Sequence, residues 1–261
     1  MQNGRPVSGQ DANAGEQAVL LLQSACCTLH PAILFAHSPI LQLRKHLPWV
    51  LPFAAFMALL GVVPLLELSP VLDQVVRIVI VGGILLTVSR PVIDLKLRNW
   101  FGSVLLGVLV FVIWIAPDVI SPSWRNGVLF NNDIVGRPEG GLPEAGRDNP
   151  LALGLRFFRA ALIVPIVEEL FWRGWLPRVV NHPDDFRRVP LGTFTPAIFL
   201  ITAILFATEH GSWWDVGLAA GLLYNWWMMR TRSLGDLILS HAVTNACLSA
   251  WVIGARRWEY W

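Results

Sequence analysis

The sequence predicts an all-α fold, a polytopic integral membrane helical bundle with about seven to eight transmembrane helices. Three observations support this prediction. First, 54% of the 261 residues are hydrophobic and only 15% are charged, whereas a soluble domain has about 25% charged residues. Second, the apolar residues form long runs without the strict alternation of barrel strands. Third, the 13 tryptophans suit the boundary between lipid tails and head groups, where this side chain concentrates.

The first half of the chain contains three predicted membrane helices. Residues 1–46 form an N-terminal segment that we expect to be partly disordered, and its apolar stretch over 18–40 leaves an extra span open. Residues 117–150 are rich in Gly, Pro, Asn and charge, which predicts an extramembrane loop. Between these segments, over 47–116, lie three apolar runs close to the roughly 20 residues that a membrane helix needs: Leu47–Leu66, Val71–Ser89 and Trp100–Ala116.

The second half predicts a core of four helices over residues 151–255, followed by a short tail at 256–261. The first helix spans Leu151–Val180 and contains Pro165, which we expect to interrupt it. The other three apolar runs are Phe194–His210, Trp213–Met229 and Leu234–Ile253.

The basic residues predict an orientation. When seven spans are counted from Leu47, the basic clusters between them fall on one side: Arg44, Lys45, Arg90, Lys96, Arg98, Arg178, Arg187, Arg188, Arg230 and Arg232. The positive-inside rule makes that side cytoplasmic. We therefore expect a multi-pass protein of a bacterial inner membrane, with its site facing the cytoplasm. Arg256 and Arg257 are exceptions, because this count leaves them on the other side.

The composition argues against several classes of partner and cofactor. The net charge is only +2 and no long basic run occurs, so no nucleic-acid partner is predicted. The three cysteines, Cys26, Cys27 and Cys247, lack the spacing of a zinc site or of a disulfide framework. We expect no metal and no other cofactor, and membrane lipids as the surroundings.

Ionisable side chains within the apolar runs are the strongest functional signal, because such groups are costly in a bilayer and mark functional sites. The first cluster reads E-E-x-x-x-R and consists of Glu168, Glu169 and Arg173. Successive helical residues point about 100° apart, so the two glutamates face different directions. Glu169 and Arg173 can pair at the i, i+4 spacing, which leaves Glu168 free to face a cavity. Taken alone, a solvated Glu–Arg pair at a helix end that emerges from the membrane explains this motif better than a functional site does.

Two further motifs follow on separate helices. Phe206 and His210 form an F-x-x-x-H motif at the end of an apolar run, and Glu209 beside them is expected to point away and has no assigned role. His241 and Asn245 form an H-x-x-x-N motif, whose spacing places both side chains on one helix face. Interhelical hydrogen bonding is the alternative explanation of this last pair.

The order of the three motifs resembles the CPBP family, which comprises the CAAX proteases and bacteriocin-processing enzymes and includes the Ras-converting endopeptidase. The segment Thr231–Asn245 (T-R-S-L-G-D-L-I-L-S-H-A-V-T-N) and the Gly217-x-x-x-Gly221 spacing are also similar to the family pattern. The resemblance covers about Leu162–Ala250, and residues 1–150 show no such likeness.

The resemblance implies a metal-independent intramembrane glutamate endopeptidase that acts on a peptide or lipidated protein. Glu168 would be the general base that activates water, and His210 would hold that water. His241 and Asn245 would form the oxyanion site, and Glu169 with Arg173 would support the geometry. The candidate site residues are therefore Glu168, Glu169, His210, His241 and Asn245, with Arg173 as support.

Two rival functions stay open from the sequence. Glu168, His210 and His241 could instead form the two-His, one-carboxylate site of a zinc hydrolase, although no H-E-x-x-H motif occurs. A non-catalytic membrane scaffold or a transporter is the second rival, but no internal repeat of the kind found in transporters is visible.

Overall fold

The computed structural model describes residues 39–138 and 140–261. The predictions for residues 1–38, including the extra span, lie outside this part of the chain. The chain divides into two units, of which the second, His46–Trp261, contains everything described below except the start of the first helix.

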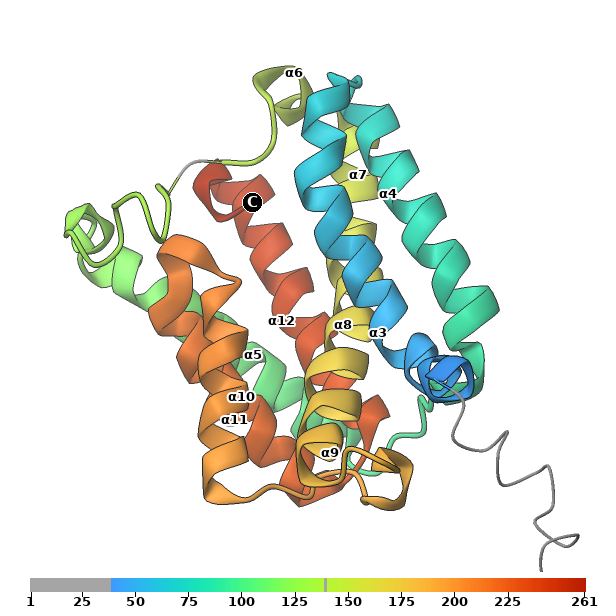
Figure 1. The fold of residues 1–261 in the computed structure, drawn as a ribbon. Helices are drawn as coiled ribbons and strands as arrows, with labels where there is room; N and C mark the ends of the chain where they lie inside the picture. The colour runs from blue at the N-terminus through green and yellow to red at the C-terminus, as the bar shows by residue number, and fades with distance from the viewer. Residues whose placement is uncertain (1–38, 139) are drawn as a thin grey trace, which may run out of the picture. The chain divides into compact units, whose positions relative to one another are not determined.

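The fold is all-α as predicted, and no strand occurs in the residues that the structure describes. Each of the seven apolar runs forms a helix. The helices are α3 (Pro39–Val62), α4 (Pro70–Ile84), α5 (Trp100–Ile120), α6 (Glu144–Arg147), α7 (Pro150–Phe158), α8 (Val164–Glu169), α9 (Leu176–Asn181), α10 (Pro196–Thr208), α11 (Trp214–Thr231) and α12 (Leu234–Ala255) (Figure 1).

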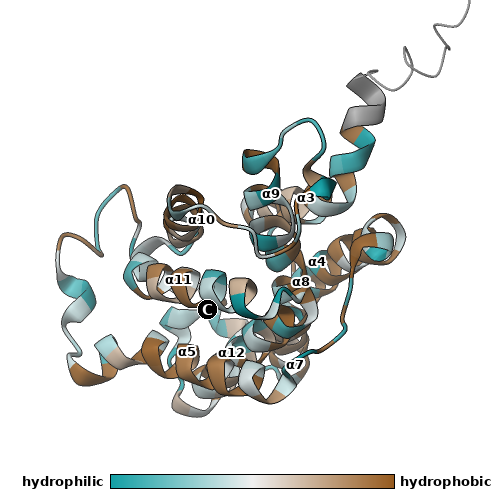
Figure 2. Ribbon diagram, turned by 90° about the horizontal axis from the view of Figure 1, so that it is seen from below, coloured by the Kyte–Doolittle hydropathy of each residue, from teal (hydrophilic) through white to brown (hydrophobic). Residues whose placement is uncertain are grey.

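Five helical segments of the described chain are long and apolar enough to cross a membrane: Leu43–Leu66, Pro70–Val92, Trp100–Ile120, Pro150–Asn181 and Leu234–Ala255. The sequence predicted seven to eight spans. Two of the predicted runs are not among these five segments: α10 is a shorter apolar helix, and α11 is not among the helices that are long and apolar enough. Hydrophobic residues line the outward sides of α4, α5 and α10 (Figure 2). The protein is therefore a multi-pass integral membrane protein.

The fourth predicted helix is continuous but irregular. It joins α7, α8 and α9 through two π-helical turns, Arg159–Ile163 and Leu170–Trp175. Pro165 is the second residue of α8, after Val164, and its missing N–H and its ring are incompatible with regular α-helical bonding to the preceding turn. The helix thus accommodates the proline with a widened turn instead of ending there. Such turns are frequent at functional sites.

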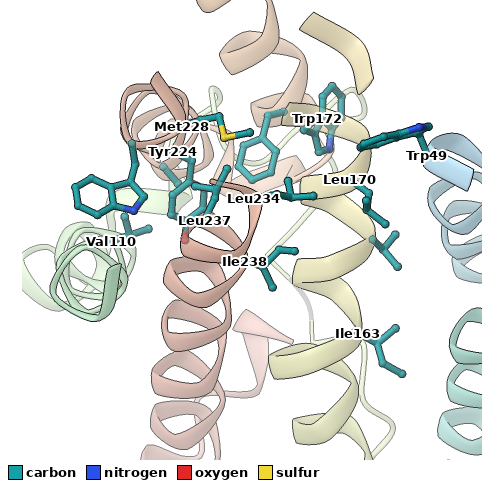
Figure 3. Packing of buried hydrophobic residues seen from close by; sticks show 14 of the residues in the cluster. Trp49, Val110, Ile163, Leu170, Trp172, Tyr224, Met228, Leu234, Leu237 and Ile238 are labelled. Carbon is teal, nitrogen blue, oxygen red and sulfur yellow. The ribbon is translucent and has the colours of Figure 1, made fainter. Parts of the chain in front are cut away.

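Close contact between helices orders the core. At Gly107 of α5 an added Cβ would overlap the Ser240 carbonyl oxygen and the Val243 side chain of α12, so only glycine allows this approach. Thr244 of α12 donates a 2.8 Å hydrogen bond to the Gly107 carbonyl across the same contact. Leu237 of α12 packs in the buried apolar cluster that also joins α8 and α11 (Figure 3). The position of α12 is therefore set by α5 on one side and by this cluster on the other.

The helices of the second unit end at two opposite ends (Figure 1). The basic end comprises residues 90–98, 178–188 and 230–236. Here the Arg98 backbone N–H donates to Asp236 and its side chain donates to the Thr231 carbonyl.

The C-terminal end comprises residues 118–125, 140–148, 209–215 and 256–261. There Arg125 pairs with Asp118 at 3.0 Å, and Arg256 pairs with Asp148. Arg256 and Arg257, the two exceptions to the predicted orientation, thus lie at the end opposite to the basic end. Arg257 pairs with the carboxylate of Glu259 there, as Arg256 pairs with that of Asp148.

Replacing Gly107 by alanine should destabilise the protein by about 1–3 kcal/mol, because α5 and α12 must separate to make room. Gly83→Ala in α4 is the matched control, because no atom lies within 4 Å of the added Cβ. Thermal unfolding in detergent measures both variants. Equal melting temperatures would show that the α5–α12 contact is not a constraint.

Candidate active site

The two neighbouring glutamates of α8 face different surroundings, as the helical spacing predicts. Glu168 is 6% exposed and lines a cavity of about 200 Å³. Its Oε2 atom is buried and has no hydrogen-bond partner in the described part of the chain. Glu169 is fully buried and does not line this cavity. Of the two carboxylates, only that of Glu168 therefore faces the cavity.

Glu169 is held in a buried ionic network. Its Oε1 accepts a hydrogen bond from Arg173 Nη1 at 3.1 Å, as the i, i+4 spacing predicted. Arg173 also donates from Nε to Asn225 Oδ1 at 3.0 Å, and its guanidinium lies 4.2 Å from the centre of the Phe206 ring. Asn225 in turn donates to the Phe199 carbonyl, which ties α11 to α10. Sequence reasoning missed Asn225, because nothing in its local pattern marks it.

His241 lies between the two glutamates. Its Nδ1 is 2.8 Å from Glu169 Oε1, and its Nε2 is 3.9 Å from Glu168 Oε2. A carboxylate can only accept here, so Nδ1 carries a proton and donates it. This bond orients the ring and directs Nε2 toward Glu168 and the cavity. Sequence reasoning placed Glu169 with Arg173 but did not find its bond to His241, which joins residues 72 positions apart.

His210 reaches the same cavity from the end of α10. Its Nδ1 donates to the Phe206 carbonyl at 2.8 Å, so in the neutral ring Nε2 is an acceptor. Gly217 makes this position accessible, because an added Cβ there would lie 3.1 Å from His210 Nδ1. The Gly217-x-x-x-Gly221 spacing therefore provides room for the imidazole, and Gly221 provides room for the backbone of Ala203.

Asn245 lies one turn after His241 and lines the cavity. One of its two amide N–H groups donates to the Ala160 carbonyl of the first π-helical turn at 2.9 Å, which leaves the other as a donor. Tyr224 also lines the cavity and donates to Thr244 Oγ1 at 2.8 Å. Sequence reasoning did not identify this tyrosine, since a single tyrosine in an apolar helix carries no motif.

The expectation that Glu209 points away from His210 is wrong. Trp172 Nε1 donates to Glu209 Oε1 at 2.9 Å, which brings the end of α10 against the second π-helical turn. Ligand atoms of Glu168, Glu209 and His210 all lie within 4.8 Å of one another. These three residues could hold a metal ion, whereas the set expected for a zinc hydrolase contained His241 in place of Glu209.

The three motifs thus contribute to one cavity. Its polar lining includes all four residues expected to act on substrate or water: Glu168, His210, His241 and Asn245. Trp114 of α5 closes one side, and Tyr260 and Trp261 lie at the C-terminal end of the cavity. The cavity has room for a water molecule and the atoms around one peptide bond.

Residues 150–247 match a family model described as Rce1-like, type II CAAX prenyl endopeptidase. This segment is similar to the CAAX protease family, and we call it the CAAX-protease-like segment. It begins at the first residue of α7 and includes all three motifs. Neither the curated proteins nor the solved structures that were searched contain a match to this chain.

Replacing Arg173 by alanine in the CAAX-protease-like segment should destabilise the protein by about 3–5 kcal/mol, because Glu169 would be left as a buried, uncompensated charge. Arg256→Ala is the control, since Arg256 and Asp148 are both exposed at the C-terminal end. Thermal unfolding in detergent is the measurement. An unchanged melting temperature for Arg173→Ala would contradict the supporting role of this pair.

Proposed function

We propose that this protein is an intramembrane endopeptidase that hydrolyses a peptide bond through a water molecule activated by Glu168. One observation carries the proposal: Glu168, His210, His241 and Asn245 line one cavity within a segment that matches a family of endopeptidases. A transporter or scaffold would not require these four groups to converge on one space.

Glu168 is the proposed general base. Its Oε2 has no protein hydrogen-bond partner among the described residues and therefore can accept a proton from water. The Nε2 atom of His210 is the proposed acceptor of the second hydrogen of that water, because Nδ1 is already bonded to the Phe206 carbonyl. With two acceptors around it, the water presents a lone pair to the carbonyl carbon of the substrate.

His241 and Asn245 are the proposed oxyanion donors. When His241 is an imidazolium, Nε2 is a donor, and the bond from Nδ1 to Glu169 stabilises this charged form. Asn245 has one amide N–H that is not used by Ala160. Each preorganised donor in a site shielded from water contributes up to about 3–4 kcal/mol to transition-state stabilisation.

The proposed substrate is a peptide or a lipidated protein at the membrane, as the family description implies. A bacterial inner membrane remains the proposed location. The positive-inside rule supports a cytoplasmic position for the basic end. The cavity extends toward Tyr260 and Trp261 at the opposite end, so we propose that the site opens away from the cytoplasm. This proposal differs from the sequence-based expectation, which did not include the position of the cavity along the helices.

Replacing Glu168 by glutamine should abolish cleavage, because the amide has nearly the same shape but cannot act as a base. The measurement compares the membrane proteins and peptides that accumulate uncleaved in cells with the variant and with the unchanged protein. Glu144→Gln is the matched control, since Glu144 is exposed on α6. Equal cleavage by Glu168→Gln, with the variant still in the membrane, would reject the mechanism.

A zinc hydrolase is the second candidate, and the proximity of Glu168, Glu209 and His210 favours it. We propose the metal-independent route, because a metal bound by this set would leave His241 and Asn245 without a part in ligation. Cleavage by the purified protein should therefore persist after treatment with a strong chelator. Loss of cleavage that zinc restores would establish the metal route instead.

A further inference from the structure

A second cavity, of about 460 Å³, lies beside the catalytic cavity, and Trp261 lines both. It is formed by α4, α7, the first π-helical turn, the end of α3 with the turn that follows it, and residues 141–143. We call it the arginine pocket, because Arg77, Arg156 and Arg159 all line it. Three guanidinium groups in helical segments of a membrane protein are costly, and such groups mark functional sites.

Only one of these arginines has a carboxylate partner. Arg77 pairs with Asp73 at 3.0 Å, and Asp73 also accepts from the Gln74 amide. Arg159 is 8% exposed, and its Nε donates to Gln74 Oε1 at 2.9 Å. Its two terminal nitrogens make no hydrogen bond with the described residues. Arg159 is therefore a buried cation that is solvated by one amide oxygen.

Arg156 also has no carboxylate partner among the described residues. Its Nη1 atom lies 3.5 Å from the Gly141 carbonyl oxygen. Its guanidinium carbon lies 5.1 Å from the centre of the Trp261 ring. Neither Arg156 nor Arg159 forms an ion pair within the part of the chain that the structure describes.

The charges of the pocket indicate which ligand it would take. The charged side chains that line it are Arg77, Arg156 and Arg159 together with Asp73 and the exposed Glu67. Arg159 adds one buried positive charge that has no carboxylate partner among the described residues, and one monoanionic carboxylate would match it. Planar guanidinium groups with unused N–H donors also match the two oxygens of a carboxylate.

The first π-helical turn connects this pocket to the reaction. Arg159 faces the arginine pocket, while the next residue, Ala160, lines the catalytic cavity and accepts the hydrogen bond from Asn245. We propose that the arginine pocket binds a carboxylate of the peptide substrate, either an acidic side chain or a free C-terminus, while the scissile bond lies beside Glu168. This inference rests on the proposed function and adds a specificity determinant to it.

Binding to the full-length Glu168→Gln protein in detergent tests the inference separately from turnover. The probe is a library of short synthetic peptides in matched pairs, with Asp or Asn at one position and with a free or an amidated C-terminus. Affinity enrichment read by mass spectrometry should favour the acidic or free-carboxylate members by roughly ten-fold, as expected for one charge-assisted pair. The preferred pair identifies the source of the carboxylate.

Arg159→Gln in the same background should abolish this preference, and Arg137→Gln, which removes an exposed arginine from the loop before α6, should retain it. Arg156→Gln is the second variant if Arg159→Gln does not fold, since Arg156 is only half-buried. Equal enrichment of acidic and neutral peptides, or a preference that survives both substitutions, would overturn the inference.

A lipid ligand is a separate outcome. Thermal unfolding of the same proteins in bilayer discs of phosphatidylglycerol or phosphatidylcholine would detect it. An arginine-dependent stabilisation by the anionic lipid, without any peptide preference, would reject the substrate carboxylate. A peptide preference in a protein that fails the Glu168 cleavage test would instead retain the pocket and reject the proposed enzyme.

Discussion

The bond between His241 and Glu169 is the interaction on which the site depends. It joins α12 to α8, and Arg173 extends it to α11 through Asn225. All of these groups are buried, so each charge is stabilised by a partner rather than by water. The Oε1 atom of Glu169 bonds both Arg173 and His241, which fixes the His241 ring. The neighbouring Glu168 takes no part in this network, and its Oε2 has no partner among the described residues. Two adjacent residues of one helix thus differ in surroundings: Glu169 is bonded within the network, and Glu168 faces the cavity.

The irregular helix that carries both glutamates also organises the space around them. Its first π-helical turn offers the Ala160 carbonyl to Asn245 and directs Arg159 into the neighbouring pocket. Its second turn brings Trp172 to Glu209. Within a regular α-helix, Pro165 would cause a kink or a break. The π-helical turns therefore keep the helix continuous. The first of them also places Ala160 at the catalytic cavity and Arg159 at the arginine pocket.

The helices before the CAAX-protease-like segment complete both cavities. Trp114 of α5 lines the catalytic cavity, and Gly107 accepts the hydrogen bond that holds Thr244 of α12. Arg77 of α4 lines the arginine pocket. Residues 1–149 lie outside the family match. Nevertheless, α5 lines the catalytic cavity and α4 lines the arginine pocket. The first half of the chain therefore contributes to the lining of both cavities.

The sequence by itself determined the helices and the motif residues, because the length of an apolar run and the 100° step of a helix are local properties. From these it followed that Glu168 and Glu169 diverge and that Glu169 can pair with Arg173. Only the tertiary structure decided the convergence of the motifs, the bond to His241 and the position of Glu209. These depend on helix packing between residues far apart in the chain, at glycine contacts such as Gly107 that no local pattern reveals.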